Sequence, residues 1–100
     1  MVKHIVFWKL KDSAEGRDKS ANAQLVKERL EELVGRIPGL LRIEVGVDFL
    51  RGDTSSDLVL YSELASRQAL DDYQAHPEHQ AVIPLIRALT SERRSVDYEI

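Results

Sequence analysis

The strongest constraint on the fold is the order in which the spacing of hydrophobic residues changes along the 100-residue chain. A spacing of two residues is typical of a strand with one buried face, and a spacing of three or four is typical of a helix. Here the spacings follow one another as strand, helix, strand, strand, helix, strand. We expect strands over residues 2–10, 41–49, 58–64 and 96–100, a first helix carrying the apolar positions 25–37, and helical segments over 66–73 and 77–91.

This order predicts an α+β fold, a single ferredoxin-like β-α-β-β-α-β domain over residues 1–100 with an antiparallel sheet and the helices on one face. The opposite sheet face then holds a second apolar set, formed by Ile5, Phe7, Val59 and Tyr61 with Ile43 or its alternating neighbours. A monomer rarely exposes so large an apolar patch. Because two sheets packed face to face would cover it, we expect a symmetric homodimer whose strands form an α/β barrel.

Two prolines divide the last helical region and create a joint rich in side chains that move protons. Proline disfavours the helical conformation of the residue before it and suits the first helical position, so a new turn should begin at Pro77 and Pro84 should kink or restart the helix. Tyr73, His76 and His79 gather at the first joint. A helix start repels positive charge, so we expect His79 to be neutral at pH 7, the form that accepts a proton.

Each candidate side chain also has a structural explanation, and the residues alone leave both readings open. His4 lies in an apolar strand, where backbone hydrogen bonds can hold a buried histidine. Tyr73 could simply pack its ring in the core with its hydroxyl exposed to water. His76, which precedes a proline, is suited to capping a helix. Asp97, in the last strand, is suited to orienting an imidazole or to plain solvation.

Composition excludes several classes of partner and chemistry. With 14 basic and 17 acidic residues, the chain offers no electrostatic footprint for nucleic acid or an anionic membrane, so we expect neither. The absence of cysteine removes disulfides, thiolate catalysis and cysteine-bound metals. His76 and His79 lack a third ligand nearby, and we expect no metal.

The sequence also carries no targeting signal, membrane span or well-known catalytic motif that we can identify. There is no glycine-rich phosphate loop and no nucleophile elbow. No apolar run approaches the roughly 20 residues that a bilayer span needs, and the first strand leaves no room for a leader peptide. We expect a soluble, cytoplasmic protein.

Four segments carry a resemblance to a known family. They are VKHIVFWKLKD at 2–12, IPGL at 37–40, DYQAHPEH at 72–79 and VDY at 96–98. Together they resemble the stress-responsive A/B barrel domains, a branch of the dimeric α/β-barrel proteins, over nearly the whole chain. The resemblance implies a homodimer with a central barrel and, in each subunit, a cleft between sheet and helices. Many members of the family have no assigned reaction.

The resemblance also implies roles for particular residues. Plant polyketide cyclases of similar pattern close a linear polyketide by aldol condensation without metal or cofactor. Their essential tyrosine matches Tyr73, their essential histidine matches His79, and a further pocket histidine matches His4. Trp8 and Ser62 stand where those enzymes carry aliphatic pocket residues.

We therefore expect a small apolar cleft in each subunit that takes a small apolar or aromatic ligand and no cofactor. The candidate catalytic residues are Tyr73 and His79. The candidate substrate-binding residues are His4, Trp8, His76 and Asp97.

Two classes of function remain open. One is a stress-related binding protein with no assigned reaction. The other is a cofactor-free enzyme, a cyclase-like lyase or a monooxygenase, in which His79 acts as base and Tyr73 donates a hydrogen bond. A cleft on which both side chains converge favours the enzyme, and a filled cleft favours the binding protein.

Overall fold

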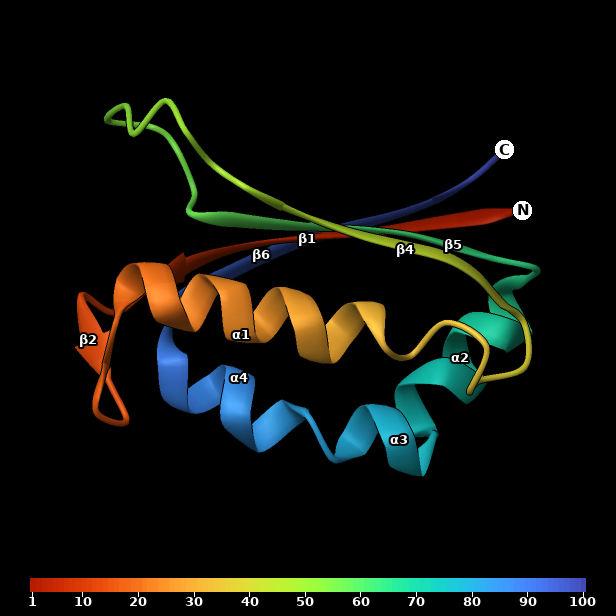
Figure 1. The fold of residues 1–100 in the computed structure, drawn as a ribbon. Coiled ribbons are helices and arrows are strands. Elements are labelled where there is room, and N and C mark those ends of the chain that lie inside the picture. The colour runs from red at the N-terminus through yellow and green to blue at the C-terminus, as the bar shows by residue number, and fades with distance from the viewer.

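A four-stranded antiparallel sheet lies against a layer of helices in the computed structural model, which describes residues 1–100 (Figure 1). The elements in chain order are β1 (Val2–Leu10), β2 (Ser13–Ala14), β3 (Arg17–Asp18), α1 (Lys19–Glu31), β4 (Leu40–Val47), β5 (Leu58–Leu64), α2 (Arg67–Ala75), α3 (Pro77–Gln80), α4 (Ile83–Leu89) and β6 (Thr90–Glu99). The sheet order is β4-β5-β1-β6, and β2 and β3 form a separate small hairpin. The expected ferredoxin-like fold is confirmed.

The core lies between the sheet and the helices. On β1 the alternating residues that the sequence placed on one face are all buried: Val2, His4, Val6, Trp8 and Leu10. The third large strand, β5, has the predicted bounds, and its alternating residues from Leu58 to Leu64 are buried as well. Because side chains alternate across a strand, these two central strands bury one face against the helices and leave the other outside.

The predicted strand over residues 41–49 is two residues shorter at its end and contains an irregularity near its start. β4 runs from Leu40 to Val47, with a register shift between Leu40 and Arg42. Ile43 pairs with Ser62, a buried residue of β5, so Ile43 faces the helices. On the outer face β4 instead contributes the alternating neighbours of Ile43, which include Arg42 and Glu44.

The first helix begins and ends earlier than the apolar pattern predicted. Asp18 caps α1 by accepting a hydrogen bond from the backbone N–H of Ala21 at 2.8 Å. The helix ends at Glu31, although Leu33 and Ile37 beyond it are also buried. Residues 32–36 form turns that carry these apolar side chains onto the core, and such turns mimic helical spacing in the sequence. The polar segment before α1 forms the β2–β3 hairpin.

The last helical region is broken twice. Ser66 caps α2, α3 begins at Pro77 as expected, and Pro84 lies in the first turn of α4. The chain then enters β6 at Thr90, so the helix predicted to reach residue 91 is too long and the strand predicted over 96–100 is too short. β6 is an edge strand with a charged first half, so it lacks the apolar alternation that would identify it.

The outer sheet face carries a connected set of apolar side chains. Strand register places Ile5, Phe7, Val59, Tyr61, Val96 and Tyr98 on this face. Phe7, Val96 and Tyr98 are 38%, 48% and 43% exposed in the single chain. The loop between β4 and β5, which projects beyond the sheet in Figure 1, adds Phe49 and Leu50, which are even more exposed. None of the helices combines the length and the apolar character that crossing a membrane requires.

Candidate functional site

A cavity of about 330 Å³ lies between the inner sheet face and the helices. Its lining residues come from β1, α1, β5, α2, α3, α4 and β6, and they are His4, Val6, Trp8, Leu30, Leu60, Tyr73, Gln74, His79, Gln80, Ile83, Ile86, Arg87 and Arg93. The structure thus brings His4, Trp8, Tyr73 and His79 to one cavity. They come from two segments that lie more than sixty residues apart in the sequence.

Tyr73 is a buried residue of α2 whose hydroxyl has no hydrogen-bond partner in the protein. Burial raises the pKa of the phenol to about 12, because removing the group from water disfavours the phenolate. The positive charge of Arg93 opposes this effect. Tyr73 therefore stays protonated near neutral pH. A buried hydroxyl without a partner typically destabilises a fold by about 1–3 kcal/mol, so its retention here calls for a functional explanation.

His79, in the single turn of α3, packs on the Tyr73 ring with the ring centroids 4.4 Å apart. Its Nδ1 lies 3.1 Å from the carbonyl oxygen of Gln74. A carbonyl only accepts hydrogen bonds, so Nδ1 carries the proton and the lone pair of Nε2 is free in the neutral ring. His79 is thereby held in the tautomer that a general base requires.

The pKa of His79 is shifted in the direction expected from the sequence, but the main cause of the shift differs. Burial lowers the pKa of His79 below 6.5, and the charges of His4 and Arg93 lower it further. The hydrogen bond to Gln74 opposes them. Removal from water is the largest cause, and the helix start that the sequence indicates is not the main one. α3 is a turn of only four residues, so its backbone dipole is small.

His4 is buried on β1 and its Nδ1 donates a hydrogen bond to Oδ1 of Asp97 on β6. Its ring lies edge-on to that of Tyr73, with the centroids 6.2 Å apart. Ser62 donates a hydrogen bond to the His4 carbonyl at 2.7 Å and does not line the cavity. Asp97 likewise lies outside the lining and orients the His4 imidazole, which is one of the two roles that the sequence left open.

His76 lies outside the cavity lining and takes the capping role. Its Nδ1 accepts a hydrogen bond from the backbone N–H of Glu78 at 3.1 Å, at the start of α3. His76 therefore does not share the cavity with Tyr73 and His79, because its extended backbone before Pro77 directs the ring to the helix end.

Two arginines of the cavity were missed from the sequence. Arg87 lies on α4 and Arg93 on β6, and both line the cavity. An inward position for Arg93 follows only if the last strand begins at Thr90, whereas the predicted strand began at residue 96. Continuing the alternation of Val96 and Tyr98 backwards along the chain would have placed Arg93 on the inner face with Asp97.

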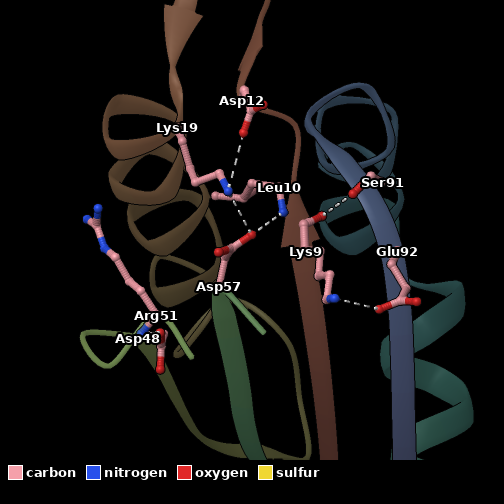
Figure 2. Close-up of polar contacts among 9 residues, drawn as sticks. All are labelled: Lys9, Leu10, Asp12, Lys19, Asp48, Arg51, Asp57, Ser91 and Glu92. Atoms are coloured by element: carbon pink, nitrogen blue, oxygen red, sulfur yellow. Dashed lines mark hydrogen bonds and ion pairs between the residues drawn. The ribbon is translucent and has the colours of Figure 1, made fainter. Parts of the chain in front are cut away.

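A second hollow, of about 560 Å³, lies at the C-terminal end of β1 and is polar. Several of its charged groups are paired, as Figure 2 shows. The ammonium group of Lys19 lies 3.6 Å from Asp12 and 3.5 Å from Asp57, and the Asp57 carboxylate accepts a hydrogen bond from the backbone N–H of Leu10 at 2.7 Å. This network joins the end of β1 to the start of α1 and to the residue before β5. We assign it a structural role.

The comparison with family models matches residues 2–100 to the stress-responsive A/B barrel domain. This chain belongs to the stress-responsive A/B barrel domain family. The comparison with curated proteins gives no match for this A/B barrel domain.

Solved structures of similar fold include proteins with and without a described reaction. A dimeric ferredoxin-like protein of unknown function from Bacteroides fragilis is 31% identical over 99% of this chain and 95% of that one, with a TM-score of 0.78. A dimeric ferredoxin-like protein of unknown function from Thermobifida fusca is 22% identical over 99% and 90%, with a TM-score of 0.84. A hydroxynitrile lyase from Passiflora edulis is 14% identical over 99% and 92%, with a TM-score of 0.81. At 22% and 14% identity, the last two show the fold alone.

Removing the Tyr73 hydroxyl should stabilise this A/B barrel domain. Tyr73→Phe deletes a buried polar group without a partner, so we expect the free energy of unfolding to rise by about 1 kcal/mol. The matched control is Tyr61→Phe, because the Tyr61 hydroxyl donates to Glu63 at 2.6 Å and its loss should lower stability. Urea unfolding measures both. Equal destabilisation by the two changes would show that the Tyr73 hydroxyl already has a partner.

The lowered pKa of His79 predicts a specific loss of stability in acid. As pH falls below 6.5, the unfolded chain takes up a proton at this position before the folded chain does. Stability is therefore full above that pH and falls until the folded pKa is passed. His79→Gln should reduce this loss, as measured by urea unfolding across the range, with NMR titration of the histidines in the unsubstituted protein. His76→Asn keeps a capping acceptor and should leave the loss unchanged. A normal or raised pKa for His79 would contradict the prediction.

Proposed function

We propose that this A/B barrel domain binds a small, oxygen-bearing molecule in the cavity and catalyses proton transfer on it without a cofactor. One observation carries the proposal. A histidine with a lowered pKa packs directly on a tyrosine whose buried hydroxyl has no partner, and both side chains line the same cavity. Pairs of titratable groups whose environments push their pKa values apart are characteristic of acid–base sites.

The proposed chemistry is removal of a proton from a carbon atom next to a carbonyl group. Nε2 of His79 takes the proton, the electron pair of the C–H bond forms an enolate, and the negative charge gathers on the carbonyl oxygen. The Tyr73 hydroxyl donates a hydrogen bond to that oxygen, and the raised pKa of Tyr73 ensures that the proton is present. The Gln74 carbonyl, which accepts from Nδ1, stabilises the imidazolium that forms.

The polar groups around this pair support its orientation. His4 packs edge-on to Tyr73 and is held by Asp97. We propose that His4 and Trp8 contact the bound molecule, while Asp97 acts through His4. The reactions named for relatives do not choose the substrate, since the hydroxynitrile lyase and an antibiotic biosynthesis monooxygenase are 14% and 23% identical and one fold supports many chemistries.

We propose further that the domain is a homodimer that pairs its outer sheet faces. The exposed apolar side chains of Phe7, Val96 and Tyr98 support this proposal, because a monomer rarely exposes such a patch to solvent. Two similar structures, from Bacteroides fragilis and Thermobifida fusca, are themselves described as dimeric. A cytoplasmic location belongs to the same proposal and rests on the cysteine-free sequence.

Solvent exchange on a neutral ketone tests the catalytic proposal. In D₂O, the wild-type protein should speed replacement of the methyl protons of acetophenone by deuterium, followed by NMR. His79→Gln should abolish the acceleration. Tyr73→Phe should slow it roughly 100-fold or more, because one oxyanion donor is lost. His76→Asn is the matched control and should retain the wild-type rate. An acceleration that survives in His79→Gln, or its absence from the wild-type protein, would overturn the assignment of His79 as base.

A charge on the outer sheet face should separate the dimer. Val96→Glu places a carboxylate within the proposed interface, so light scattering at micromolar concentration should give the mass of a single chain. Val34→Glu is the matched control, because Val34 is similarly exposed, at 43% against 48%, but follows α1 on the helical side. A monomeric wild-type protein, or a Val96→Glu dimer, would contradict the proposed pairing of faces.

A further inference from the structure

The only formally charged side chains that line the cavity are Arg87 and Arg93, and no carboxylate lines it. Neither arginine makes an ion pair anywhere in the chain. Arg93 has a single long contact, 3.5 Å from its Nη1 to the hydroxyl of Ser95. The cavity therefore combines apolar walls with positive charge that the protein leaves uncompensated.

Strand register places Arg93 on the cavity side. Arg93 pairs with Trp8, and residues paired across an antiparallel ladder project from the same face of the sheet. The next residue, Arg94, pairs with Phe7 on the outer face and forms an ion pair with Glu92 at 3.5 Å. Arg93 and Arg94 thus project from opposite faces of the sheet, and of the two only Arg93 lacks an acidic partner.

The acidic residues of the same strand are engaged elsewhere. Asp97 binds His4, Glu99 binds Arg67 at 3.0 Å, and Glu92 lies 4.0 Å from Lys9. The chain as a whole carries a formal charge of −3, so the positive cavity runs against the overall balance. In the polar hollow of Figure 2, by contrast, Lys19 is paired with two aspartates.

We propose that the natural ligand of the cavity is a small carboxylic acid that also carries a carbonyl oxygen. Its carboxylate binds Arg93, with Arg87 adding positive charge, because a guanidinium pairs with a carboxylate through two parallel hydrogen bonds. Its carbonyl oxygen accepts the Tyr73 hydrogen bond, and its apolar body lies against Trp8. This assignment rests on the proposed function and adds the class of substrate to it.

A matched pair of probes tests the charge requirement directly. 4-Acetylbenzoate carries the carboxylate and the ketone, and 4-acetylbenzamide replaces only the charged group by a neutral one. The protein has one tryptophan, Trp8, which is buried and lines the cavity, so its single indole N–H resonance reports binding by NMR titration. The proteins compared are the wild type, Arg93→Gln and, as the matched control, Arg94→Gln.

We expect the wild type and Arg94→Gln to bind the acid roughly 10-fold or more tightly than the amide, which is the usual scale of a hydrogen bond to a charged group. Arg93→Gln should lose this preference and bind the amide as before. Circular dichroism verifies that the Arg93→Gln variant is folded, which we expect because Arg93 is exposed. Equal binding of acid and amide by the wild type, or a preference that persists in Arg93→Gln, would overturn the carboxylate proposal.

The failure of this proposal is distinguishable from failure of the proposed function. Exchange on neutral acetophenone does not need Arg93, so exchange together with equal binding of acid and amide removes only the carboxylate assignment. Binding of the acid through Arg93 without exchange supports the assignment and overturns the catalytic step. If neither probe shifts the Trp8 resonance and no exchange occurs, both proposals are overturned.

Discussion

The pairing of β1 with β6 is the contact on which the site depends. It sets Asp97 opposite His4 and Arg93 opposite Trp8, so one register supplies both the partner of a buried imidazole and the charge of the cavity. Side chains alternate across a strand, so a slip of one residue would turn Arg93 and Asp97 to the outer face. The hydrogen bond between His4 and Asp97 joins the two strands at that register.

Burial shifts the pKa values of Tyr73 and His79 in the directions that the proposed proton transfer requires. Removal from water disfavours every charged form, so it raises the pKa of the phenol and lowers that of the imidazole. The result is a proton donor and a proton acceptor in contact at neutral pH. The cost falls on stability, since the Tyr73 hydroxyl is buried without a partner.

The charged groups of the molecule divide into those that are paired and those that are not. Around Asp57 and Lys19 every charge meets an opposite charge or a backbone donor, and the network holds three segments together (Figure 2). In the cavity, the other residues that line the walls beside Arg87 and Arg93 are apolar or neutral. Charges that a fold does not use internally remain available to a ligand, which is why the carboxylate proposal rests on these two residues.

The amino-acid sequence by itself determined the features that arise from local geometry. The alternation of β1 and β5 and the helix start at Pro77 follow from side-chain spacing and from the steric limits of proline. The tertiary structure alone decided that His76 caps a helix while His79 enters a cavity, that β6 begins early enough for Arg93 to lie opposite Trp8, and that burial is the largest cause of the lowered pKa of His79. These outcomes depend on which distant segments exclude water from each group, and no local spacing encodes that.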